Sequence, residues 1–139
     1  MNKLSKLFII ASIAGFILAA FLKVVQLLTG NQAYVLLFET DYIVVIQDLQ
    51  PQFLIGFIFH FVICYISVVI LYYLLTVIHL EKSILMYVIF FTTGSGLLFP
   101  LTMFSESTPE ITDLVAWFYW LIGHILFSLV VGVLIRKWV

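Results

Sequence analysis

Four apolar stretches, each long enough to cross a membrane, dominate this chain. They cover about residues 4–28, 53–78, 83–101 and 111–136. A helix crosses the hydrocarbon core of a bilayer with about 20 apolar residues, and its backbone polar groups are then all paired inside the helix. The sequence therefore predicts an all-α, polytopic membrane protein in which four transmembrane helices form one bundle across residues 1–139.

The composition agrees with a bilayer as the solvent of this chain. Of its 139 residues, 65% are apolar and 9% are charged, whereas a water-soluble domain of this size needs a larger charged surface. Lys3 and Lys6 ahead of an apolar run are also typical of a secretory signal. Because the apolar run continues past Lys23, we expect a retained membrane helix instead of a cleaved signal.

The segment at about 32–50, between the first two spans, has a different character. Its apolar pieces, 34–38 and 42–46, are too short to span, and Glu39, Asp41 and Asp48 interrupt them. The segment is also too apolar for a solvated loop. We expect an interfacial or re-entrant segment over the mouth of the bundle.

Local signals predict where several helices end. The first span should stop at Gly30, a residue common after the last turn of a helix, and Pro100 should end or kink the third span. Thr108, Pro109 and Glu110 match an N-cap, a first-turn proline and a first-turn acid, so the last helix is expected to start there.

The charges are distributed unevenly between the two ends of the predicted bundle. With four spans both termini share one side, and five of the six basic residues lie there: Lys3, Lys6, Lys82, Arg136 and Lys137. Six of the seven acids lie on the other side: Glu39, Asp41, Asp48, Glu106, Glu110 and Asp113. Since cytoplasmic loops carry the excess of Lys and Arg, both termini are expected on the cytoplasmic side of the membrane.

Polar residues recur at helical spacing in three spans, which is how the interior of a membrane bundle is built. The predicted ligand- or proton-binding residues are Lys23 from the first span, His60 from the second and His124 from the fourth. The alternative for Lys23 is that its long side chain only reaches to the membrane interface. Six further residues on the same faces or near them are expected to support these three: Gln26, Cys64, Ser67, Asp113, Trp120 and Ser128.

The two histidines indicate what the interior does. An imidazole in a hydrocarbon slab is costly unless satisfied, which makes it a site hypothesis, and it changes charge between pH 5 and 8. His60 and His124 are therefore expected to respond to external pH or to bind a small ligand. The simpler alternative is that each ring only hydrogen-bonds a neighbouring helix.

Other chemistries have less support in the sequence. A haem b between His60 and His124 is an alternative, although the predicted boundaries place them about five residues, or roughly 7 Å, apart in depth. Cys64 is the only cysteine, so a disulfide framework and a cysteine-based zinc site are excluded. Phosphate loops, metalloprotease motifs and basic nucleic-acid surfaces are absent from the sequence. No cofactor is predicted, and an enzyme is less expected than a binding protein.

Short motifs across most of the chain resemble the YagU-like family of small bacterial inner-membrane proteins. They are Ile13-Ala14-Gly15 with Ala20-Phe21-Leu22-Lys23, then His60, Phe99-Pro100-Leu101, Gly123-His124 and the basic end at Arg136 and Lys137. The resemblance implies a multi-span protein linked to acid resistance as a stress response, with Lys23, His60 and His124 carried over. Where that family can carry a Glu, this chain has Trp120, so a proton partner of His124 would be Asp113 or Glu110.

A different class of function is a non-catalytic assembly subunit. Ala11, Gly15 and Ala19 repeat every four residues in the first span, and residues 92–96 of the third are Thr, Gly or Ser. Small residues allow helices to approach closely. These faces would then dock a second copy of the chain or a larger membrane complex.

Overall fold

The computed structural model describes residues 2–40, 43, 45–46, 48–104 and 109–139, and its regular structure is entirely helical over those ranges. The elements are α1 (Lys3–Thr29), α2 (Ala33–Leu36), α3 (Gln52–Val77), α4 (Ile84–Leu98), the 3-10 helix η1 (Phe99–Phe104) and α5 (Leu114–Trp138). Four helices are long and apolar enough to cross a membrane: α1, α3, α4 with η1, and α5. The predicted fold class, an all-α protein with four such helices, is confirmed.

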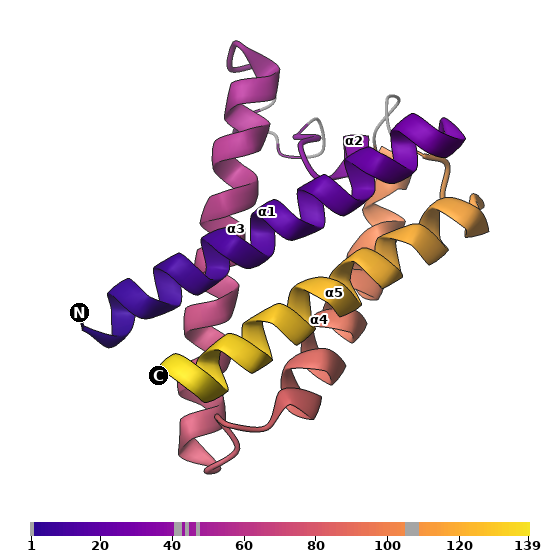
Figure 1. The fold of residues 1–139 in the computed structure, drawn as a ribbon. Coiled ribbons are helices and arrows are strands. Elements are labelled where there is room, and N and C mark those ends of the chain that lie inside the picture. Colours follow the sequence, from indigo (N-terminus) through magenta and orange to yellow (C-terminus); the bar gives the residue numbers. More distant parts are fainter. Residues whose placement is uncertain (1, 41–42, 44, 47, 105–108) are drawn as a thin grey trace.

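The four long helices pack in a definite order. α1 and α5 lie side by side and run in opposite directions, α4 packs on α5, and α3 packs on α1 (Figure 1). The N- and C-termini therefore lie at the same end. α3 and α4 leave their connecting turn and then diverge, so the space between them is wedge-shaped (Figure 1).

The small-residue face of α1 is used inside the chain. A Cβ atom on Gly15 would lie 3.0 Å from the ring of Phe61 and 3.4 Å from Sγ of Cys64, both on α3. Ala11 and Ala14 are buried beside it. Close packing of this kind lets van der Waals contact hold membrane helices together where lipid tails are as apolar as the side chains. The α1 face that was considered for docking thus packs on α3.

Two glycines of α5 allow similarly close approaches of this helix to α1 and to α4. A Cβ on Gly123 would lie 2.8 Å from Cδ1 of Leu18 in α1, and one on Gly132 would lie 3.1 Å from Cα of Ile84 in α4. Larger residues at these positions would separate the helices. α5 is thereby the central helix of the bundle, in contact with both α1 and α4.

The observed helix ends agree with the sequence at one place and differ at another. Gly30 ends α1 with a φ of 73°, and its N–H donates to the carbonyl of Gln26, as predicted. α5 begins at Leu114 and not near 111, because the carboxylate of Asp113 caps the helix by accepting from the N–H of Ala116. Glu110 precedes the helix, and Thr108, the predicted cap, lies outside the described residues.

The described part of the segment between α1 and α3 packs against the bundle. Leu36 and Leu37 are buried, and α2 contacts α1 and α5. The ring of Phe38 stacks on Phe57 of α3 with centroids 6.0 Å apart. Of the three acids predicted to interrupt this segment, Asp41 lies outside the described residues.

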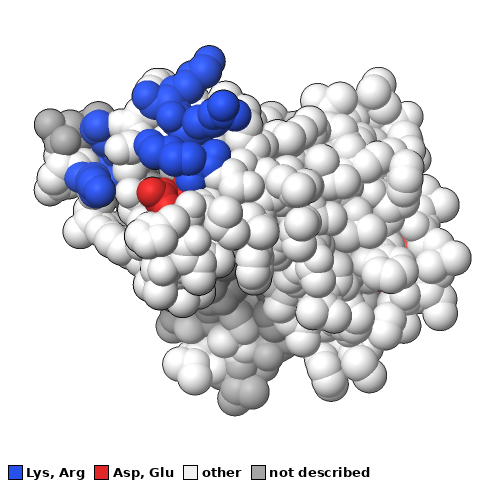
Figure 2. Space-filling model, turned by 90° about the horizontal axis from the view of Figure 1, so that it is seen from below, with Lys and Arg blue, Asp and Glu red and all other residues white. Residues whose placement is uncertain are grey.

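Basic side chains gather at the end of the bundle that holds both termini. Figure 2 shows Lys and Arg together on one region of the face seen from below. The ammonium group of Lys6 donates to the backbone carbonyl of Trp138, and Nζ of Lys3 lies 3.5 Å from the hydroxyl of Tyr72. These contacts join the start of α1 to the last turns of α5 and α3.

Candidate functional site: a cavity between the spans

A cavity of about 740 Å³ occupies the wedge between α3 on one side and α4 and α5 on the other. Leucine, isoleucine and phenylalanine side chains form most of its wall. Its remaining lining comprises six residues with a polar group or a thiol and one glycine: His60, Cys64, Ser67, Ser95, Trp120, His124 and Gly94. Ligand pockets in proteins typically combine apolar walls with a few polar groups in this way.

His124 is held in a fixed orientation on the α5 wall. Its Nδ1 lies 2.8 Å from the carbonyl oxygen of Trp120, one turn earlier, and the two ring centroids are 4.4 Å apart. The carbonyl only accepts, so Nδ1 carries the hydrogen, and in the neutral ring Nε2 has a free lone pair. Trp120 is itself fixed, because its Nε1–H donates to the carbonyl of Ser95 on α4 at 2.9 Å.

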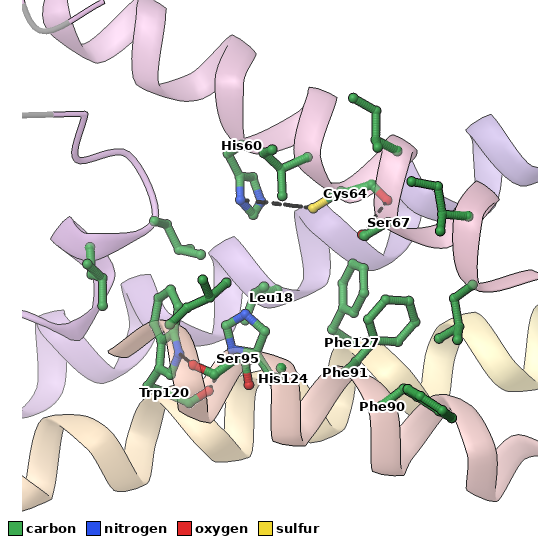
Figure 3. Close-up of a pocket in the computed structure, with 18 of the residues that line it drawn as sticks. Leu18, His60, Cys64, Ser67, Phe90, Phe91, Ser95, Trp120, His124 and Phe127 are labelled. Carbon is green, nitrogen blue, oxygen red and sulfur yellow. Dashed lines mark hydrogen bonds between the residues drawn. The ribbon is translucent and has the colours of Figure 1, made fainter. Parts of the chain in front are cut away.

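His60 lies on the opposite wall and faces His124 across the cavity (Figure 3). It is buried, and the edges or faces of Phe38 and Phe61 pack on it at centroid distances of 5.6 and 5.1 Å. Its polar contacts are long: Nε2 lies 3.5 Å from the carbonyl of Gly15 and 3.7 Å from Sγ of Cys64. Aromatic packing therefore positions the ring, and weak hydrogen bonds leave it able to contact a ligand.

Counted from the starts of their helices, the two histidines also differ by less than the predicted boundaries implied. His60 is eight residues after Gln52, where α3 begins, and His124 is ten residues after Leu114, where α5 begins. At the helical rise this difference of two residues is roughly 3 Å. The later start of α5 accounts for most of the change.

Charged side chains do not contribute to the cavity wall over the described residues. The titratable groups that line it are His60 and Cys64 from α3 and His124 from α5, while Asp, Glu, Lys, Arg and Tyr are absent from this lining. An ion inside such a wall is costly unless it has a partner. The charge state of the two imidazoles thus governs the electrostatics of the cavity.

Lys23 lies outside the lining of this cavity. Its Nζ donates to Oε1 of Gln26 at 2.8 Å and sits 4.7 Å from the ring centroid of Tyr34. Gln26 in turn donates to Oε1 of Gln32 at 3.2 Å. The structure therefore brings His60 and His124 together and places Lys23 and Gln26 in a separate cluster where α1 meets the segment that follows it.

The other predicted supporting residues divide in the same way. Cys64, Ser67 and Trp120 line the cavity, and the hydroxyl of Ser67 donates to the carbonyl of Cys64 at 3.0 Å. Asp113 caps α5 outside the cavity lining. Ser128 is fully buried, donates to the carbonyl of Ile125 at 2.7 Å and is not part of the lining.

Sequence reasoning missed two contributions to the site. Ser95 was grouped with the small residues of the third span, yet its carbonyl anchors Trp120. Leu36 and Leu37 also line the cavity. Their short apolar piece was recognised, but no periodicity in the sequence indicates which helices it contacts.

Comparisons with known proteins do not assign a family or a function to this cavity. Across the described ranges, no three His, Cys, Asp or Glu side chains are grouped so as to hold a metal ion. The chain matches no protein-family model, and no curated protein and no solved structure is significantly similar to it.

Proposed function

We propose that this chain is a small inner-membrane protein that binds an amphiphilic ligand between its spans and responds to external acid through His60 and His124. The observation that carries the proposal is that both imidazoles, from different helices, line one largely apolar cavity (Figure 3). Placing two imidazoles in the hydrocarbon region costs free energy unless they form hydrogen bonds or bind a ligand. A ligand with a polar head and an apolar body matches both parts of the wall.

The response to acid follows from the composition of the cavity wall. Imidazole gains a proton between pH 8 and 5, and the described wall contains no carboxylate to pair with the added charge. Protonation of either ring therefore favours the entry of water or an anionic group, or a change in the separation of α3 from α4 and α5. The resemblance to YagU-like proteins supports the same link to survival in acid.

Fluorescence of Trp120 tests whether His124 titrates inside the cavity. In a protein carrying Trp117→Phe and Trp138→Phe, Trp120 is the remaining tryptophan. We expect its emission to fall as the pH is lowered from 8 to 4, because an imidazolium quenches an indole in contact with it and the two rings are 4.4 Å apart. His124→Phe in the same background should give a flat profile.

His79 supplies the matched control for this titration. It follows α3 at the turn toward α4 and is not part of the cavity lining. His79→Phe should leave the pH profile of Trp120 unchanged. A flat profile in the parent protein, or a profile that survives His124→Phe and disappears with His79→Phe, would contradict the proposed role of the cavity.

Cysteine labelling tests the proposed orientation, with the basic end in the cytoplasm. In a Cys64→Ser background, we expect a membrane-impermeant maleimide to label Glu110→Cys in intact cells and to label Val139→Cys only after the cells are opened. Glu110 is exposed ahead of α5, and Val139 follows the basic last turn of that helix. The opposite labelling pattern would reverse the orientation and would place the cavity histidines nearer the cytoplasmic side.

A further inference from the structure

The cavity opens sideways toward the surroundings of the bundle. Four α3 residues that line it are also 43–59% exposed: Ile63, Ile66, Ile70 and Leu74. Phe90, on the α4 side of the wedge, is 52% exposed. In a bilayer, groups that are both lining and exposed at mid-span meet acyl chains, so an occupant reaches this cavity from the lipid phase.

The polar groups of the cavity are complementary to a ligand that both donates and accepts hydrogen bonds. Nε2 of neutral His124 is an acceptor, since Nδ1–H is already bonded to Trp120. His60 has a ring N–H whose nearest backbone acceptor, the carbonyl of Gly15, is 3.5 Å away. A carboxylic acid supplies both complements, with an O–H for one ring and a carbonyl oxygen for the other.

The absence of charged side chains from the described wall limits which acidic headgroups the cavity can hold. Because no Lys or Arg lines the described cavity, a phosphate, which stays ionised, would have only a protonated imidazole as its counter-charge. A carboxyl group and an imidazole share one proton, and the pair has no net charge whether the proton is on oxygen or on nitrogen. The carboxyl group is thus the acidic headgroup that this wall accommodates at least cost.

The rest of the cavity is suited to a hydrocarbon chain. Beyond Ser67, toward the basic end of the bundle, the α3 wall consists of Ile70, Leu71 and Leu74. Phe90 and Phe91 of α4 form the facing surface. From His60 to Leu74 the α3 wall of the cavity extends about 21 Å along the helix.

From this geometry we infer that the ligand is a long-chain carboxylic acid drawn from the membrane. Its carboxyl group lies between His60 and His124, and its chain lies in the gap between α3 and α4. The inference rests on the proposed function, since it names the chemical class of that ligand. It adds that the ligand enters from the lipid phase and carries a carboxyl headgroup. The pH response of Trp120 tests neither statement.

Quenching of Trp120 by brominated lipids tests the inference. The Trp117→Phe, Trp138→Phe protein is placed in phosphatidylcholine vesicles and titrated with bromostearic acid, its methyl ester, and brominated phosphatidylcholine as the background for unspecific partition. We expect saturable quenching by the acid, at least tenfold tighter than by the ester. His124→Phe should remove the preference for the acid, and Ser128→Ala, a buried serine outside the lining, should retain it.

The outcomes separate this inference from the proposed function. Equal affinity for acid and ester would overturn the carboxyl assignment and leave an apolar ligand cavity. No saturable quenching by either lipid, with the pH response of Trp120 intact, would overturn the inference alone. Saturable quenching by the acid without any pH response would support the inference and contradict the acid-responsive part of the proposed function.

Discussion

Replacing Gly56 with alanine is expected to lower the free energy of unfolding by about 2 kcal/mol, a typical cost of overpacking. The added Cβ would lie 1.9 Å from the carbonyl oxygen of Phe38 and 2.7 Å from its carbonyl carbon. These are backbone atoms, which cannot rotate away, so the segment containing α2 must move off α3. We expect a lower melting temperature in detergent and faster proteolysis within residues 33–40.

Gly94→Ala is the matched control for this substitution. Gly94 is also a helical glycine, but an added Cβ there meets no atom within 4 Å. Alanine is favoured over glycine in a helix interior by up to about 1 kcal/mol, so the control should melt at the same temperature as the parent or slightly higher. Equal melting temperatures for Gly56→Ala and Gly94→Ala would show that Phe38 does not lie against α3.

Replacing Trp120 with alanine is expected to cost on the order of 3 kcal/mol. The side chain is only 6% exposed, packs against the ring of His124 and donates a hydrogen bond to the carbonyl of Ser95 on α4. Its removal takes away one of the two donors to that carbonyl, the other being the N–H of Phe99, and empties space between α4 and α5. Unfolding in a denaturing detergent, followed by circular dichroism, measures the loss.

Two further variants separate the hydrogen bond of Trp120 from its packing. Trp120→Phe keeps most of the ring contacts and should lose about 1 kcal/mol, the net worth of one hydrogen bond. Trp117→Ala removes a tryptophan that is 37% exposed and should cost less than Trp120→Ala. If Trp117→Ala costs as much, the indole of Trp120 is not a link between α4 and α5.

The spans and the pairing of the two histidines could be predicted because both depend on local patterns. Long apolar runs determine which segments cross a membrane, and the spacing of Gly56, His60 and Cys64 places them on the buried face of α3. The same periodicity places Trp120 and His124 one turn apart on α5. For these residues, knowledge of which helical face is buried was sufficient to predict that the two imidazoles face the interior of the bundle.

The remaining features depend on contacts that periodicity does not describe. Lys23 was assigned to the interior by the helical spacing of the polar residues in the first span, but its aromatic partner is Tyr34, which follows the turn at Gly30. The backbone of Phe38, which follows α2, lies against Gly56 of α3. This contact depends on how the two segments pack in three dimensions. The start of α5 was misplaced because the helix is capped by Asp113 and not by Thr108, the predicted cap.

The packing order of the helices gives the cavity one adjustable wall. α3 packs on α1 on one side of the wedge, whereas α4 packs on α5, and α5 in turn lies against α1. A small rotation of α3 about its contact at Gly15 changes the width of the wedge without disturbing the α4–α5 pair. Occupants of different width would then be accommodated by movement of α3 against α1 and against Phe38.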